Sequence, residues 1–388
     1  MSVSTPQGFT AAGVACGLKA SGGKDLAIVV NRGPRYAAAA VFTSNRAKAN
    51  PVLWSQQVIG DGVVSAIVLN SGGANCYTGA EGFQATHRTA ELAAELLDVS
   101  SADILICSTG LIGEQLDLAK IEAGVTGACR ALTGDTQSED GGHDAALAIM
   151  TTDTHPKEAL VRRDGWSIGA MAKGAGMLAP GLATMLVVLT TDADLPADAL
   201  DASLRAATKV TFDRLDSDGC MSTNDTVALL CSGASGITPH AGEFTDALTE
   251  VCQLLAQALQ QDAEGASHDI TIEVVNAATE DDAVEVGRAV ARSNLFKTAI
   301  FGNDPNWGRV LASVGTTSAA FDPYGIDVTI NGIRVCRAGG PDQPRELVDL
   351  TARAAHVLID LGAGRERASI LTNDLTHDYV HENSAYAS

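Results

Sequence analysis

The 388-residue sequence has few basic residues for its size. It contains 26 Lys and Arg against 47 Asp and Glu, so the formal net charge is -21 at pH 7. Nucleic acids and anionic membrane surfaces are bound by basic faces, so this balance argues against both kinds of partner. If the substrate is anionic, a few basic residues at its binding site are needed to offset repulsion by the net negative charge of the chain.

The sequence also lacks a secretion signal and a long apolar run. The first 18 residues carry no charge and are interrupted by proline and glycine, unlike the positively charged start of a signal peptide. The uncharged stretch 174–191 contains only five consecutive large apolar residues, which is too short a run to span a membrane. We therefore expect a cytoplasmic protein with no membrane partner.

Metal and cofactor motifs are missing as well. The 8 cysteines are scattered, with no CxxC pair, which is typical of reduced thiols in a cytosolic protein. His377 and His381 are spaced i, i+4, but the stretch HDYVH lacks the glutamate of HExxH and a helical context. The glycines at 17–24 and 174–176 match neither a P-loop nor a dinucleotide fingerprint. We predict no metal site and no bound cofactor.

What the sequence does contain is the composition of a globular protein. Hydrophobic residues make up 46% of a chain too long for one simple core, so we expect two domains, or one large domain with an appendage. Periodicity predicts helices at 80–97, 142–150, 196–209, 241–262 and 281–291, and strands at 26–30, 37–42, 63–69, 104–107, 185–189 and 270–275. Turn residues at 31–34 and at Asn331-Gly332 indicate hairpins, and a further strand pair is predicted within 356–372.

Several predicted elements end in loops that are rich in hydrogen-bonding residues. These loops cover 70–75, 108–113, 151–154, 216–226, 262–266 and 302–309. For the loops at 70–75, 108–113 and 151–154, turn and capping chemistry is one explanation and a polar site is the other. A loop such as 302–309, dense in turn formers around a tryptophan, packs a domain junction or lines a pocket. Thr109-Gly110 at a strand end also offers a hydroxyl beside a backbone N–H, which is the composition of an oxyanion hole.

The stretch around Thr184 has the most specific chemistry. Glycines and Pro180 exclude a helix just before the apolar run that starts at 185. Thr184 is therefore expected at the N-terminal end of a buried strand. Attack of the Thr184 hydroxyl on the Ala183 carbonyl, followed by hydrolysis of the ester, would make Thr184 a new N-terminus. Its α-amine, with a pKa of about 8, would then act as the base for its own hydroxyl. The alternative is a strand threonine with no chemical role, and geometry decides between the two.

Eight sequence blocks, in this order and at these distances, resemble those of the arginine-biosynthesis ornithine acetyltransferases, also called glutamate N-acetyltransferases. The blocks are NSGGAN (70–75), STGLIG (108–113), MTTDT (150–154), KGAGMLAPGLATML (173–186), STNDT (222–226), DAEGA (262–266), GNDPNWGR (302–309) and YVHENSAY (379–386). The resemblance runs from about Gly8 to the last residue. One block would be a weak signal, whereas eight in register are specific.

The resemblance implies self-cleavage between Ala183 and Thr184, and acetyl transfer from N-acetylornithine to glutamate through an acetyl ester on Thr184. In the family's pattern, Thr109 and Gly110 stabilise the oxyanion. Substrate binding is implied for Thr151, Lys173, Thr184, Glu264, Asn383 and Ser388. Lys173 is expected to meet the α-carboxylate that both substrates share, and Glu264 the side-chain amine of ornithine.

The resemblance also implies an α+β fold. This is a layered αββα-type sandwich of the aminopeptidase and ornithine acetyltransferase kind, with a smaller C-terminal α/β part. Residues 1–183 would form an α chain, and residues 184–388 a β chain with the nucleophile at its N-terminus. The family suggests an α2β2 heterotetramer whose other partners are small-molecule substrates. Whether acetyl-CoA is a second acetyl donor stays open.

Two other functions stay open at this point. A related N-terminal-nucleophile aminopeptidase or amidohydrolase would share the fold and the self-cleavage, but such enzymes typically use serine where this sequence has Thr184. A non-catalytic acidic binding protein would keep an uncut chain. A denaturing gel with one band near 39.8 kDa would indicate this second alternative.

Overall fold

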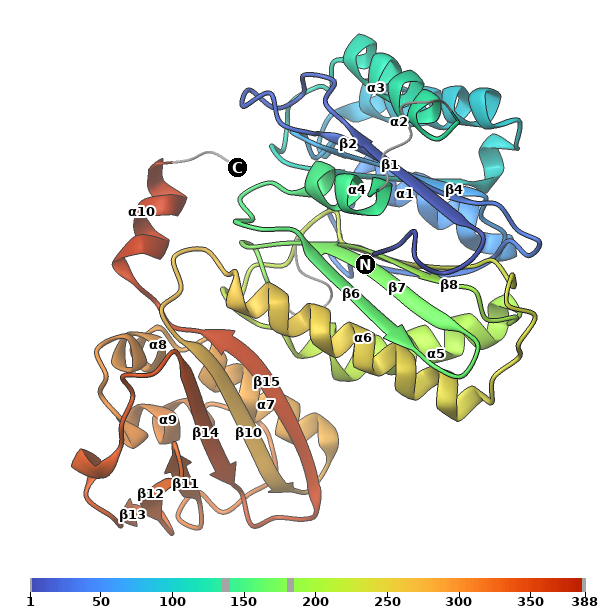
Figure 1. The fold of residues 1–388 in the computed structure, drawn as a ribbon. Helices are drawn as coiled ribbons and strands as arrows, with labels where there is room; N and C mark the ends of the chain where they lie inside the picture. The colour runs from blue at the N-terminus through green and yellow to red at the C-terminus, as the bar shows by residue number, and fades with distance from the viewer. Residues whose placement is uncertain (1, 134–139, 180–184, 386–388) are drawn as a thin grey trace.

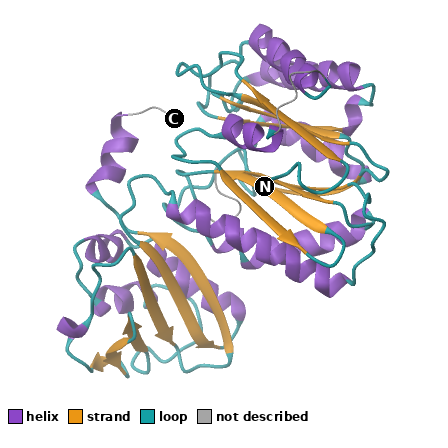
Figure 2. Ribbon diagram, viewed as in Figure 1, coloured by secondary structure: helices purple, strands orange, loops and turns teal. Residues whose placement is uncertain are grey.

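The computed structural model describes residues 2–133, 140–179 and 185–385. Its larger part is a sandwich of four layers, in which two β-sheets face each other and helices cover their outer sides (Figure 1 and Figure 2). A smaller part with a third sheet and its own helices follows towards the C-terminus. The predicted αββα layering with a C-terminal α/β part is therefore confirmed.

The first sheet contains four strands in the order β1-β2-β4-β5. Their bounds are Phe9–Val14 for β1, Leu26–Asn31 for β2, Ala66–Ser71 for β4 and Ile104–Thr109 for β5. Strands β1, β2 and β4 alternate in direction, whereas β4 and β5 run parallel with Ser71 opposite Thr109. The carboxyl ends of β4 and β5 therefore meet at one edge of the sandwich.

Helices surround this first sheet. Helices α2 (Gly79–Leu97) and α3 (Leu118–Ala131) cover its outer face, and α4 (Gly141–Ile149) packs on β1. Helix α1 (Asn50–Val58) lies along the edge strand β5, where Ser55 Oγ donates to the Ile106 carbonyl at 2.8 Å and accepts from its N–H at 3.0 Å. Trp54 Nε1 donates to the Ile104 carbonyl at 3.0 Å. These hydrogen bonds satisfy backbone groups of an edge strand that could otherwise pair with a strand of another chain.

The second sheet contains five strands in the order β3-β9-β8-β7-β6. Their bounds are Ala37–Phe42 for β3, Thr226–Cys231 for β9, Leu186–Thr191 for β8, Ser167–Lys173 for β7 and Lys157–Arg162 for β6. The central strand β8 is antiparallel to β7 and parallel to β9, so Leu186 lies opposite both Lys173 and Thr226. Side chains of β8 alternate between two cores: Leu186 packs between the sheets, and Val187 packs towards the helices.

Helices α5 (Ala197–Val210) and α6 (Ala241–Gln261) cover the outer face of the second sheet (Figure 1). In α6 the fully buried Phe244, Leu248 and Val251 follow helical spacing and form one apolar face. Burial of each such side chain stabilises the fold by about 1.5–3 kcal/mol. This strong periodicity is why both helices were predicted within one or two residues of their bounds.

The C-terminal part is built on a sheet with the strand order β13-β12-β11-β14-β10-β15. Its strands are β10 (Asp269–Ala277), β11 (Asp327–Ile330), β12 (Ile333–Arg337), β13 (Gly340–Pro341), β14 (Ala354–Asp360) and β15 (Glu366–Asn373). Its helices are α7 (Glu280–Ala291), α8 (Asn294–Phe301) and α9 (Trp307–Val314). After β15, helix α10 (His377–Ala385) extends away from this part towards the level of the first sheet (Figure 1).

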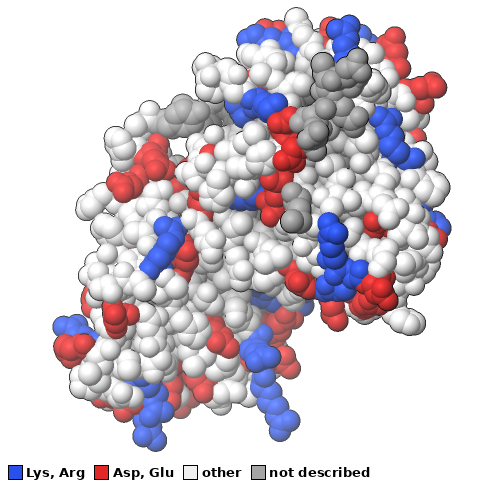
Figure 3. All heavy atoms as spheres, in the orientation of Figure 1, with Lys and Arg blue, Asp and Glu red and all other residues white. Residues whose placement is uncertain are grey.

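Short 3₁₀ segments complete the fold. They are η1 (Ile59–Asp61), η2 (Ser101–Asp103), η3 (Phe212–Arg214) and η4 (Arg345–Leu347). Acidic and basic side chains are interspersed over the face shown in Figure 3. Within the described ranges, no helix combines the length and the apolar character that crossing a bilayer requires.

Three local predictions were wrong. The turn at 31–34 makes no hairpin, because β2 belongs to the first sheet and β3 to the second. The strands at 354–360 and 366–373 do not pair with each other, since both pair with β10, which lies between them. The stretch HDYVH does have a helical context, because α10 begins at His377. The Asn331-Gly332 hairpin is confirmed: both residues have positive φ, and they join β11 to β12.

Candidate active site

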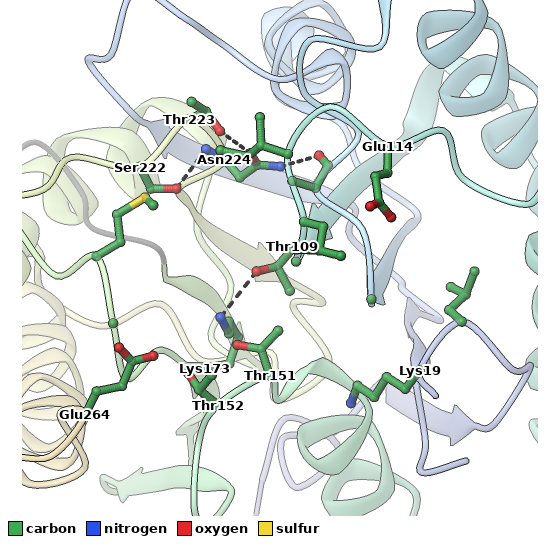
Figure 4. Close-up of a pocket in the computed structure, with 18 of the residues that line it drawn as sticks. Lys19, Thr109, Glu114, Thr151, Thr152, Lys173, Ser222, Thr223, Asn224 and Glu264 are labelled. Carbon is green, nitrogen blue, oxygen red and sulfur yellow. Dashed lines mark hydrogen bonds between the residues drawn. The ribbon is translucent and has the colours of Figure 1, made fainter. Parts of the chain in front are cut away.

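A cavity of about 550 Å³ lies where the ends of the two sheets meet (Figure 4). Its walls come from the ends of β5 and β7, from the loops between β1 and β2, after β4 and before β9, from segments after α4 and α6, and from α10. Most of the predicted site residues line it, although they are far apart in the sequence. These are Thr109, Gly110, Thr151, Lys173, Glu264 and Asn383. Ala183, Thr184 and Ser388 lie outside the described residues.

Thr109 is the last residue of strand β5, and Gly110 follows it. Gly110 has a φ of 128°, and a Cβ at this position would lie 2.5 Å from the Gly73 nitrogen, so the turn requires glycine. The Oγ1 of Thr109 accepts a hydrogen bond from Lys173 Nζ at 3.2 Å. A hydroxyl and a glycine backbone therefore line the same cavity, and the oxyanion role of the pair stays a prediction.

Lys173 is the last residue of β7 and is only 2% exposed. Burial lowers the pKa of its ammonium from the ordinary value, while the negative charge of Asp153 opposes that shift. A buried ammonium beside a threonine hydroxyl is a strong attractor for an anionic group of a ligand. The arrangement is therefore suited to hold a carboxylate at the centre of the cavity.

A buried ion triad supports this wall of the cavity. Lys157 Nζ lies 2.6 Å from Asp153 Oδ1 and 2.6 Å from Asp262 Oδ2. The Asp153 carboxylate also accepts the Gly174 N–H at 2.7 Å and the Thr151 N–H at 3.0 Å. Burial alone would raise the pKa of Asp153, but the charges of Lys173 and Lys157 outweigh it and lower the pKa to about 2. Asp153 is thus an anion that fixes the backbone beside Lys173 and at Thr151.

Glu264 and Asn383 meet on another side of the cavity. Asn383 Nδ2 donates to Glu264 Oε2 at 3.0 Å, which joins helix α10 to the segment after α6. The Glu264 N–H donates to the Ala175 carbonyl at 2.9 Å. A Cβ at Gly176 would lie 2.4 Å from Glu264 Oε2, so glycine leaves the room into which this carboxylate extends. The cavity thus has an anionic group within reach of a ligand amine.

The loop before β9 closes the remaining wall. Asn224 Nδ2 donates to the Ala74 carbonyl at 2.6 Å and to the Ser108 carbonyl at 2.8 Å, so it joins the loop after β4 to strand β5. The next residue, Asp225, is fully buried, and its Oδ1 accepts the Met185 N–H at 3.1 Å. Burial raises the pKa of Asp225 well above its ordinary value. Met185 follows Thr184 in the chain, so the described chain resumes next to these cavity residues.

The sequence-based prediction missed several residues of the cavity wall. They include Lys19, Glu114, Thr152, Ser222, Thr223 and Asn224. The last three belong to the polar loop 216–226 and to a matching family block, which was the available signal. Lys19 was considered only within a glycine-rich stretch that failed as a P-loop. The loop 302–309 does not line the cavity, because Trp307 packs against the core of the C-terminal part.

A family model described as ArgJ family matches residues 10–388. This chain belongs to the ArgJ family. Proteins named arginine biosynthesis bifunctional protein ArgJ are 64% identical to it in Streptomyces avermitilis and 59% identical in Thermobifida fusca. Each of these alignments covers 100% of both proteins. The predicted family is confirmed, as is the predicted class, an acetyltransferase of arginine biosynthesis, and neither alternative function is favoured.

Two solved structures match parts of this ArgJ-family chain. Ornithine acetyltransferase from Mycobacterium tuberculosis, solved in complex with ornithine, is 49% identical, with a TM-score of 0.44 over 48% of this chain and 96% of its own. The arginine biosynthesis bifunctional protein ArgJ from Bacillus halodurans is 34% identical, with a TM-score of 0.49 over 51% of this chain and 98% of its own.

Proposed function

We propose that this chain transfers an acetyl group from N-acetylornithine to glutamate through an acetyl ester on Thr184. One observation carries the proposal. The residues that the family pattern assigns to this chemistry, apart from those outside the described ranges, converge on a single cavity although they lie far apart in the sequence. The cavity offers a buried cation, an anion and a Thr-Gly pair, which match the charges of the two substrates and of the reaction.

The nucleophile arises by cleavage between Ala183 and Thr184. Thr184 Oγ adds to the Ala183 carbonyl, and its proton passes to the Thr184 nitrogen as the C–N bond breaks. Water then hydrolyses the ester, which leaves a carboxyl group on Ala183 and a free α-amine on Thr184. The products are an α chain of residues 1–183 and a β chain of residues 184–388. Pairing of β8 with β7 supports their continued association.

In the first half-reaction, Thr184 Oγ attacks the acetyl carbonyl of N-acetylornithine while the α-amine of Thr184 takes the hydroxyl proton. Negative charge develops on the carbonyl oxygen, where Thr109 and Gly110 stabilise it. A preorganised donor of this kind lowers a barrier by about 2.7–4 kcal/mol. The intermediate then collapses: the C–N bond breaks, the proton moves to the departing α-nitrogen, and ornithine leaves an acetyl ester on Thr184.

In the second half-reaction, the α-amine of glutamate attacks the same carbonyl, and the Thr184 oxygen leaves and regains its proton. The products are N-acetylglutamate and the free enzyme. One amide replaces another over the full cycle, so the exchange is nearly balanced in free energy and needs no ATP. A nucleophile, a base and oxyanion stabilisation are sufficient for such a transfer.

The binding roles follow from the charges of the cavity. Lys173 binds the α-carboxylate that both substrates carry, next to the Thr109 hydroxyl that it contacts at 3.2 Å. Thr151, whose N–H is fixed by Asp153, adds a hydroxyl from the same side. Glu264 binds the side-chain ammonium of ornithine, and Asn383 orients its carboxylate. We assign Ser388 a further substrate contact from the C-terminal end of the chain.

We also propose that acetyl-CoA is a second acetyl donor to Thr184. The relatives at 64% and 59% identity are named bifunctional, which supports a second activity. A thioester delivers its acetyl group to the same hydroxyl without any additional catalytic group. For assembly and location we propose an α2β2 heterotetramer in the cytoplasm, as the family pattern implies.

The proposal is tested by Thr184→Ala, with Thr249→Ala in helix α6 as a control outside the cavity. Intact mass and N-terminal sequencing of the wild type are expected to give two chains, the second starting at Thr184. Thr184→Ala is expected to stay a single 39.8 kDa chain and to produce no N-acetylglutamate from either donor. Thr249→Ala should behave as the wild type does. A Thr184→Ala protein that is cut or active would refute the mechanism.

A further inference from the structure

Lys19 is a second lysine on the cavity, and the proposed function gives it no role. Two of the chain's eight lysines, Lys19 and Lys173, line this cavity. Figure 4 shows the Lys19 ammonium pointing into the cavity towards Thr151 and Lys173, on the side away from Glu264. In a chain of net charge -21, two ammonium groups in one cavity indicate an anionic ligand.

The loop that carries Lys19 is held in place by Asp25. The buried Asp25 carboxylate accepts the backbone N–H of Cys16 at 2.7 Å, of Leu18 at 2.6 Å and of Lys19 at 3.0 Å. Burial opposes the charged form of Asp25, yet these bonds leave its pKa below the ordinary value. Lys19 Nζ itself donates to the Lys24 carbonyl at 2.7 Å. The ammonium is therefore set on a fixed loop before any ligand arrives.

Within the part of the chain that the structure describes, the Lys19 ammonium binds a backbone carbonyl and forms no ion pair. Its ammonium has no carboxylate within ion-pair distance among those residues, and Asp25 binds backbone N–H groups instead. Glu114 lines the same side of the cavity but is exposed, and Glu264 lies across it. Burial lowers the pKa of Lys19, Asp25 and Asp153 oppose this shift, and Lys173 lowers the pKa further. The two ammonium groups thus repel each other, and an anion between them relieves the repulsion.

We propose that Lys19 binds the γ-carboxylate of glutamate and so selects the acetyl acceptor. This inference rests on the proposed function. Both substrates present the same α-carboxylate and α-nitrogen, so both are held alike at Lys173. They differ in the side chain, which ends in an ammonium in ornithine and in a carboxylate in glutamate. A site that holds each in turn needs an anion and a cation at separate places. Glu264 and Lys19 lie on opposite sides of the Lys173–Thr109 pair (Figure 4).

The test compares Lys19→Met and Lys19→Arg with Lys24→Met, a lysine of the same loop whose side chain does not line the cavity. Acetylation of the β chain by N-acetylornithine is followed by intact mass, and transfer to varied glutamate is measured separately. Lys19→Met is expected to raise the KM for glutamate at least tenfold and to leave the KM for N-acetylornithine within twofold. Lys19→Arg should restore most of the affinity for glutamate, and Lys24→Met should match the wild type.

Glutamine as the acceptor isolates the γ-carboxylate, because it keeps the size of glutamate and removes the charge. The wild type should prefer glutamate strongly, and Lys19→Met should reduce that preference at least tenfold in kcat/KM. Three results would overturn the inference: an equal loss with glutamine, an equal loss with N-acetylornithine, or a loss confined to acetyl-CoA. The first two results would mean that Lys19 contacts the shared α-carboxylate or supports the fold. The third would mean that Lys19 contacts the phosphates of coenzyme A.

Two measurements separate this inference from the proposed function. Intact mass shows whether the wild type forms the acetyl ester, and calorimetry compares glutamate binding by the wild type and by Lys19→Met. If the wild type forms no acetyl ester, the proposed function fails, whatever Lys19 does. If the wild type forms the ester and Lys19→Met binds glutamate as tightly as the wild type, then only the role of Lys19 is refuted.

Discussion

Replacing Lys157 with methionine tests how the buried ion triad supports the cavity. Lys157 is fully buried and contacts both Asp153 and Asp262 at 2.6 Å. Methionine fills similar space, but it leaves two buried carboxylates without the ammonium between them. Removing one partner of a buried ion pair costs about 3–5 kcal/mol, so we expect a loss of this size in the free energy of unfolding. The KM for both substrates should rise too, because Asp153 fixes the Thr151 and Gly174 N–H groups.

The pH dependence of stability provides a second measurement on the same triad. Asp153 has a pKa of about 2 in the folded protein, below the ~3.9 of an unfolded aspartate. A depressed pKa stabilises the fold above the unfolded value, and this stability is lost as the pH falls from about 4 to 2. A shift of this size corresponds to about 2.6 kcal/mol. In Lys157→Met the pKa of Asp153 should be less depressed. The free energy of unfolding of this variant should therefore fall less between about pH 4 and pH 2 than that of the wild type.

Urea denaturation at pH 7 and at pH 3, followed by circular dichroism, measures both effects. The control is Lys209→Met, which removes an exposed lysine 2.6 Å from Glu280. Such a surface pair contributes about 0–1 kcal/mol, so the control should unfold close to the wild type. If Lys157→Met unfolds at the same urea concentration as Lys209→Met, the triad does not stabilise the fold and the reasoning is wrong.

Substitutions of Gly110 and of Asp225, each with a comparison variant, address the backbone around the cavity. Gly110→Ala should lower kcat by about 10²–10³-fold, the usual effect of losing one oxyanion donor, because its Cβ would lie 2.5 Å from the Gly73 nitrogen. Gly127→Ala, whose Cβ meets nothing within 4 Å, should leave steady-state rates unchanged, and equal rates in both variants would contradict the prediction. Asp225→Ala should cost about 1–3 kcal/mol in thermal or urea unfolding, because the Met185 N–H loses its acceptor. Asp225→Asn keeps an amide oxygen that can accept the Met185 N–H, so it should be milder than Asp225→Ala.

The elements that the sequence predicted well are those with a strong apolar period. Helices α2 and α6 were placed almost to the residue because their buried faces recur at helical spacing. Helix α10 was missed because none of its side chains is buried, so it has no apolar face to detect. The turn residues at 31–34 indicated a hairpin that does not form, because turn residues do not determine which strand pairs with which. β3 pairs with β9, nearly 200 residues further along the chain.

The site was predicted through the family resemblance rather than through local chemistry. Glu264 taken alone is an ordinary acidic residue, and nothing in the sequence near Lys173 shows that its side chain is buried. Burial arises when β7, β5 and the segment after α4 come together, which is a property of the fold. Lys19 was missed for the same reason, because the bonds from Asp25 that fix its loop join residues whose pairing no sequence period reveals.

The strand order of the second sheet determines how the protein would hold together after a break in its backbone. β3, β6 and β7 precede residue 174 and β8 and β9 follow residue 185, yet the order β3-β9-β8-β7-β6 interleaves the two groups. Two separate seams, β7 with β8 and β3 with β9, would therefore join the fragments of a chain nicked between those points. Separating such fragments would break both pairings at once and remove the interior strands β8 and β9 from the sheet.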